Sequence, residues 1–97
     1  MKVTVTREAA DWLRQEMSLE EGDYIRFHTM LYGNASSLHP NYSLGLSKEP
    51  PHRIGAQTVV DGVTYYVEKD DLWYFEGHDL TVRLKNGELD LAFTDAQ

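Results

Sequence analysis

The chain has 97 residues, no cysteine, and a net charge of −7, because 16 Asp and Glu residues outnumber 9 Lys and Arg residues. This length predicts a single domain over residues 1–97, and the absence of cysteine excludes disulfides, thiolate metal centres and cysteine nucleophiles. The acidic balance disfavours nucleic acid as a partner. Without a long apolar stretch or an apolar leader, we expect a cytoplasmic protein that does not enter the membrane.

The first predicted element is a helix over residues 7–21. Its apolar side chains fall close to every fourth residue and form one stripe of Ala9, Ala10, Leu13 and Met17, with Trp12 at its border. Thr6 precedes the helix and can cap it, because a threonine hydroxyl accepts a hydrogen bond from a free backbone N–H of the first turn. Gly22 supplies a natural end to the helix.

From residue 24 the apolar period changes to two, which indicates strands. Residues 24–31 form a first half-buried strand and residues 42–47 form a second. The segment between them, residues 32–41, is rich in Gly, Ser and Asn and is predicted to be a loop. Pro50 and Pro51 follow the second strand and end it, because proline has no backbone N–H to donate.

Two dipeptides predict tight hairpins in the second half of the chain. Asp61–Gly62 joins residues 57–60 to 63–67, and Asn86–Gly87 joins residues 80–84 to 89–93. Between these hairpins, residues 68–75 are expected to form a short helix or a wide turn. The elements together predict an α+β or mainly β fold, in which one N-terminal helix packs on a small, mostly antiparallel β arrangement of about six strands.

The histidines are far apart in the sequence, at His28, His39, His52 and His78. None has the short spacing to another histidine that zinc sites show, so no metal site is predicted. An alternative stays open in which the histidines and nearby carboxylates bind iron(II) or another divalent ion. Imidazole and oxygen ligands suit such ions.

Ser36, Ser37 and His39 lie close together in the predicted loop. A serine beside a histidine can act as a nucleophile with its base, which leaves open a small hydrolase built on Ser36 and His39. The chain lacks the Gly-x-Ser-x-Gly turn that exposes such a serine. Polar residues that bond to their own backbone are therefore favoured over an enzyme, and no catalytic residue is predicted.

Three consecutive aromatic residues, Trp73, Tyr74 and Phe75, follow an acidic run. In a helix or a turn, three adjacent rings cannot all face the interior, so at least one is expected at the surface. Protein interfaces are enriched in such rings. These residues therefore predict a surface for a protein partner or for a second copy of the chain.

The order of these elements resembles the HesB-like family, the A-type (IscA-like) iron–sulfur carriers. The resemblance rests on the opening segment over residues 3–13, the strand Tyr24–Phe27, the loop and strand over residues 32–46, and Val59–Val63 with the final strand pair. Carriers of this family hold iron or a cluster with three cysteines, which this chain lacks. The resemblance therefore implies a HesB-like fold of a cysteine-free, uncharacterised subgroup that binds neither a cluster nor another cofactor.

With this resemblance, the sequence predicts a non-enzymatic binding or accessory module related to iron–sulfur assembly. The predicted loop matches the functional loop of that family, and the aromatic run lacks full burial, so both are candidate partner or ligand surfaces. The candidate residues are Gly33, Asn34, Ser36, Ser37, His39, Trp73 and Tyr74.

Overall fold

The computed structural model describes residues 1–30 and 42–95. These described residues form seven strands, one α-helix and one 3₁₀-helix. In chain order the elements are β1 (Val3–Val5), α1 (Arg7–Glu16), β2 (Tyr24–Met30), β3 (Ser43–Lys48), β4 (Ile54–Val60), β5 (Val63–Glu68), the 3₁₀-helix η1 (Lys69–Phe75), β6 (His78–Lys85) and β7 (Glu88–Asp95). β1 is absent from the predicted elements because a strand this short shows no clear period.

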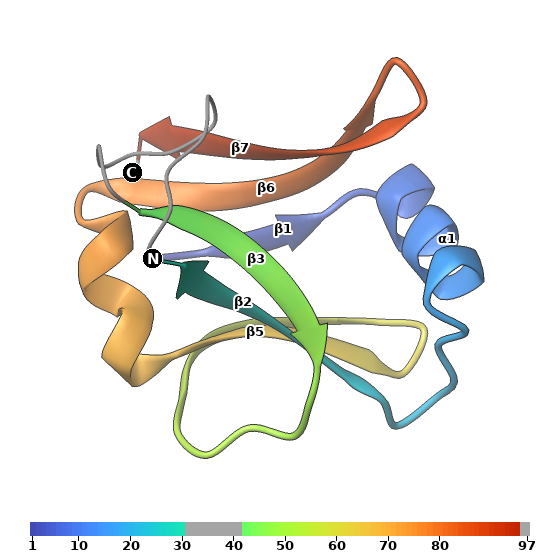
Figure 1. Cartoon of the computed structure of the whole chain (residues 1–97), viewed down its shortest axis with the longest axis horizontal. Coiled ribbons are helices and arrows are strands. Elements are labelled where there is room, and N and C mark those ends of the chain that lie inside the picture. The colour runs from blue at the N-terminus through green and yellow to red at the C-terminus, as the bar shows by residue number, and fades with distance from the viewer. Residues whose placement is uncertain (31–41, 96–97) are drawn as a thin grey trace.

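The strands form two mixed sheets, with strand orders β1-β6-β7 and β3-β2-β5-β4. The ladders β2–β3, β4–β5 and β6–β7 are antiparallel, whereas β1–β6 and β2–β5 are parallel. The predicted α+β, mostly β class is confirmed, and the structure adds a strand and two parallel ladders to it. Figure 1 shows β6 and β7 above β2 and β5, with α1 at one end of the sheets and η1 at the other.

The helix α1 begins where it was predicted but ends at Glu16, not at residue 21. Thr6 caps it, since the Thr6 hydroxyl accepts a hydrogen bond from a first-turn N–H at 3.2 Å. At the other end, Ser18 has a φ of 52° and the Leu19 N–H donates to the Arg14 carbonyl at 3.0 Å. This left-handed turn closes the helix and buries Leu19. The next two residues, Glu20 and Glu21, therefore lie outside the helix, whose dipole would disfavour negative charges in its last turn.

Both predicted hairpin turns are confirmed. Asp61 and Gly62 have φ angles of 51° and 79°, and Asn86 and Gly87 have φ angles of 55° and 78°. Both central residues of each turn are therefore left-handed, which is the type I′ geometry that matches the twist of the flanking strands.

Gly62→Val should lower the free energy of unfolding by about 2 kcal/mol. A β-branched residue is strained at a φ of 79°, and a Cβ atom at this position would collide with the Glu21 side chain. Urea unfolding measures the change. Gly87→Val is the matched control, because Gly87 has a similar φ but open space around it, so the difference between the variants isolates the collision. An unchanged urea midpoint for Gly62→Val would contradict this role of the turn.

The core lies between the two sheets, and β5 is buried on both of its faces. Tyr65 and Tyr66 point to opposite faces of β5, and they are 1% and 0% exposed. The Tyr66 hydroxyl donates to the Glu49 carbonyl at 2.8 Å, so the segment after β3 covers the outer face. Burial raises the pKa of the Tyr66 phenol to about 12. Tyr74 and Phe75 of η1 also belong to the core, which joins the short helix firmly to the sheets.

Candidate functional site

The 3₁₀-helix η1 separates its side chains into exposed and buried rows. In a 3₁₀-helix, residues three apart lie above one another. Asp70, Trp73 and Glu76, the residue that caps η1, have this spacing and are all exposed, with Trp73 at 48%. We call this row the η1 ridge. The next row, Asp71 and Tyr74, is buried. The three-residue period therefore places one indole between two carboxylates on the surface.

The aromatic rings behind the η1 ridge pack into the core. Tyr74 is 0% exposed, and its ring centroid lies 6.0 Å from that of Phe93 on β7. Phe75 packs against the same ring of Phe93 at 6.0 Å. The Tyr74 hydroxyl donates to the Tyr42 carbonyl at 3.3 Å. These contacts fix the position of η1 through its inward side chains.

A partly buried ion pair provides a second attachment for η1. Asp71 is 7% exposed and accepts hydrogen bonds from the Arg26 guanidinium at 3.0 Å and from the Thr29 hydroxyl at 3.1 Å. β5 pairs with β2 only over Tyr24–Arg26, so beyond Arg26 this side of β2 is left open for η1. Arg26 also pairs with Glu49 at 3.1 Å, which connects η1 to the segment after β3.

Glu68, the last residue of β5, forms the third attachment. It is 5% exposed, and its two carboxylate oxygens accept hydrogen bonds from the backbone N–H groups of His52 and Arg53, each at 2.7 Å. The Lys69 N–H donates in return to the Arg53 carbonyl at 2.8 Å. The segment before β4 is therefore bonded to the first residue of η1, so both ends of the short helix are held.

We expect the protein to lose stability in acid as Glu68 and Glu49 become protonated. Burial alone would raise the pKa of Glu68, but its backbone N–H donors and nearby Arg26 outweigh burial and lower the pKa from 4.5. The Ser47 hydroxyl and Arg26 lower the pKa of Glu49 from the same value. A carboxylate with a lowered folded-state pKa stabilises the fold above the unfolded pKa, and this contribution is lost as pH falls through the folded-state pKa.

Thermal unfolding from neutral pH down to about pH 3 measures this loss. Glu68→Gln should be less stable than wild type at neutral pH, because an amide offers only one acceptor oxygen to two N–H donors. Its unfolding midpoint should also fall less steeply in acid, because one titrating group is gone. A wild-type midpoint that stays constant below pH 4.5 would contradict the assignment.

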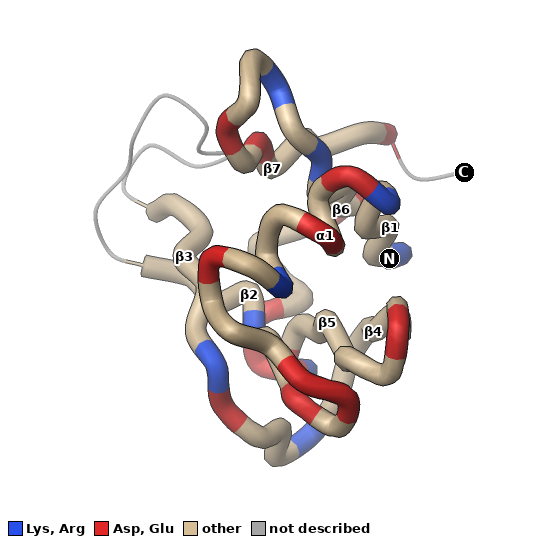
Figure 2. The backbone as a smooth tube through the Cα atoms, turned by 90° about the vertical axis from the view of Figure 1, so that its right-hand side faces the viewer, with Lys and Arg blue, Asp and Glu red and all other residues tan. Residues whose placement is uncertain are grey.

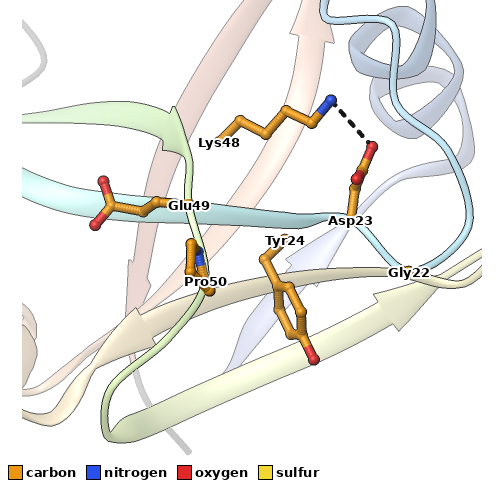
Figure 3. A pocket seen from close by; sticks show the side chains of 6 residues that line it. All are labelled: Gly22, Asp23, Tyr24, Lys48, Glu49 and Pro50. Atoms are coloured by element: carbon orange, nitrogen blue, oxygen red, sulfur yellow. Dashed lines mark ion pairs between the residues drawn. The ribbon is translucent and has the colours of Figure 1, made fainter.

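Two small pockets lie near these attachments. The larger, shown in Figure 3, has a volume of about 210 Å³, and Lys48 and Asp23 form an ion pair across it at 3.2 Å. Its lining consists of Gly22, Asp23, Tyr24, Lys48, Glu49 and Pro50. The other has about 160 Å³ and is lined by Arg26, His52, Arg53, Glu68 and Asp70. Sites for small molecules usually exceed about 300 Å³, so neither hollow favours a substrate pocket.

The structure places only part of the predicted partner surface. Gly33, Asn34, Ser36, Ser37 and His39 lie outside the described residues, so their role and that of the Ser36–His39 hydrolase alternative stay predictions.

The two candidate aromatic residues have different environments. Trp73 is exposed, as expected for at least one of the three rings. Tyr74 is a core residue, because the 3₁₀ period turns it inward beside Asp71, and it therefore offers no surface to a partner. Asp70 and Glu76 were not among the candidate residues. Their spacing of three on either side of Trp73 is the signal that could have found them.

Comparison with known proteins identifies the family. The chain is 40% identical over 82 residues to a protein of Bacillus subtilis named pyruvate dehydrogenase inhibitor, and the match covers 84% of this chain and 85% of that relative. The chain belongs to the family of this inhibitor. An uncharacterized protein of Staphylococcus saprophyticus in the same family is 30% identical over 89 residues, which are 90% of this chain and 91% of the relative. An uncharacterized protein of Staphylococcus haemolyticus is 26% identical over 97% of both chains. No family model and no solved structure matches the chain.

The predicted relation to HesB-like iron–sulfur carriers is wrong. The comparison over most of the chain leads to the pyruvate dehydrogenase inhibitor family, and no family model supports the carriers. The resemblance depended on short strand and turn patterns, such as Tyr24–Phe27 and the Asp61–Gly62 turn, which many small β-rich proteins share. The predicted role as a module related to iron–sulfur assembly is therefore also wrong.

The alternative of a divalent-metal protein has no support either. Within residues 1–30 and 42–95, no group of three or more His, Asp or Glu side chains could hold a metal ion. The described histidines are on separate elements: His28 is in β2, His52 precedes β4, and His78 begins β6. In the same parts of the chain, neither helix has the length and apolar character needed to span a membrane.

Proposed function

We propose that the protein inhibits pyruvate dehydrogenase by binding to it, and that it catalyses no reaction of its own. The 40% identity to the Bacillus subtilis pyruvate dehydrogenase inhibitor, over 85% of that protein's length, carries the proposal. An inhibitor that acts on another protein needs an interaction surface rather than a substrate pocket. The small pockets and the exposed η1 ridge agree with this requirement. Action on a metabolic enzyme also favours a cytoplasmic location.

The attachment of η1 supports a role in binding. Partners pay an entropic cost when flexible side chains and loops become ordered at an interface. The partly buried pair of Asp71 with Arg26, the Glu68 hydrogen bonds and the Tyr74 ring already hold η1 in one position. A surface carried by η1 would therefore be ordered before it meets a partner.

Titration of the purified protein into the Bacillus subtilis pyruvate dehydrogenase complex tests the proposed function. We expect pyruvate-dependent NADH formation to fall and reach a plateau as the protein concentration rises. NADH formation by an unrelated dehydrogenase is the control for interference with the assay and should not change. If pyruvate-dependent NADH formation is unaffected at saturating protein concentrations, the proposed function is wrong.

A further inference from the structure

The indole of Trp73 is exposed and at the same time held in place. Although 48% of the residue is accessible, its ring meets the ring of Tyr42 edge-on, with centroids 5.2 Å apart and an interplanar angle of 82°. It also meets the buried ring of Tyr74 edge-on at 5.8 Å. A large, oriented and partly exposed aromatic side chain is the type of residue that contributes most to binding at protein interfaces.

The charges around this indole select a kind of partner. Asp70 and Glu76 lie on either side of Trp73 in the η1 ridge, and within the described residues neither forms an ion pair. Asp71 differs, because Arg26 neutralises it in the interior. The ridge itself carries two exposed carboxylates and no cation; Lys69 in η1 and exposed Arg53, which lines a pocket with Asp70, are the basic residues beside it. Figure 2 views the molecule from the α1 side, away from η1, and shows Asp and Glu segments there too; the net charge of the whole chain is −7. A positively charged surface would therefore be attracted to the ridge.

We propose that the η1 ridge docks on pyruvate dehydrogenase by inserting Trp73 into an apolar recess bordered by Lys or Arg side chains. This inference rests on the proposed function and assigns it a contact surface. Asp70 and Glu76 pair with the basic border, while the indole supplies the apolar contact. The arrangement combines electrostatic attraction during approach with an apolar anchor that slows dissociation.

The experiment compares two ridge variants with wild type in binding to the Bacillus subtilis complex and in inhibition of NADH formation. Trp73→Ala should weaken binding by roughly tenfold or more. The double variant Asp70→Lys/Glu76→Lys should weaken binding by a similar factor and remove most of its dependence on salt concentration. The control is Glu16→Lys/Glu88→Lys, which changes the net charge equally at two exposed sites outside the ridge and should bind like wild type at physiological salt. Thermal unfolding verifies that all variants are folded.

The outcomes separate this inference from the proposed function. If wild type, both ridge variants and the control inhibit equally, the η1 ridge is not the contact surface, and the proposed function stands. If wild type neither binds nor inhibits, both proposals are wrong. Sedimentation of the protein alone provides a further test. A dimer that Trp73→Ala dissociates would show that a second copy covers the ridge, which would overturn docking on the enzyme.

Discussion

Tyr74→Ala should lower the free energy of unfolding by about 4 kcal/mol, a large fraction of the stability of a domain of this size. Tyr74 is fully buried, and its ring packs against Phe75 at 5.4 Å and Phe93 at 6.0 Å. Truncation to alanine removes these contacts, leaves a cavity between η1 and β7, and takes away the hydrogen bond to the Tyr42 carbonyl. Urea unfolding followed by fluorescence and circular dichroism measures the loss.

Two variants make this expectation specific. Trp73→Ala removes an aromatic ring of comparable size from the neighbouring position and should cost only about 1 kcal/mol, because about half of Trp73 already lies in water. Tyr74→Phe keeps the ring, loses the hydroxyl, and should cost about 1 kcal/mol. If Tyr74→Ala and Trp73→Ala were equally stable, the inward row of η1 would not be part of the core.

Asp71→Ala should lower the free energy of unfolding by about 2 to 3 kcal/mol. Among the described residues, the substitution leaves the partly buried Arg26 guanidinium with Glu49 as its remaining ion-pair partner. It also leaves the Thr29 hydroxyl without its acceptor. Because Arg26 is partly exposed and keeps this second carboxylate, the expected loss is at or below the roughly 3 kcal/mol at which the range for broken buried ion pairs begins.

Asp70→Ala is the matched control for this prediction. The two residues are adjacent and carry the same charge, but Asp70 is exposed, so its removal should change stability by less than about 0.5 kcal/mol. Urea unfolding at neutral pH measures both variants. If Asp71→Ala and Asp70→Ala were equally stable, the Arg26–Asp71 ion pair would make no measurable contribution to the free energy of unfolding.

The parts of the fold that the sequence predicts are those specified by neighbouring residues. The type I′ turns at Asp61–Gly62 and Asn86–Gly87, the Thr6 cap and the alternation in β2 all depend on patterns a few residues long. The parallel ladders β1–β6 and β2–β5 are different, because they depend on which segments pack together in three dimensions. The end of α1 was missed because a left-handed serine at position 18 closes the helix where glycine is usual.

The candidate site, like the fold, has features that neighbouring residues predict and features that depend on packing in three dimensions. The three adjacent rings indicate that one must face water, and the structure identifies it as Trp73. The choice between Trp73 and Tyr74 requires the period of η1, and the alternatives of a short helix or a wide turn left that period open. The ion pair between Arg26 and Asp71 joins residues 45 positions apart, so no sequence spacing reveals it. Short motifs also could not identify the family, which required a comparison along most of the chain.

The parallel ladder between β1 and β6 has a consequence for how the protein is made in the cell. Val3 pairs with Leu80, and the Lys2 N–H donates to the Asp79 carboxylate at 2.8 Å. While the ribosome is still adding the residues before β6, β1 has no strand to pair with and Val3 remains in water. The β1-β6-β7 sheet therefore forms only after residues 78–95 have been synthesised, and until then the apolar side chains of β1 lack their partner strand.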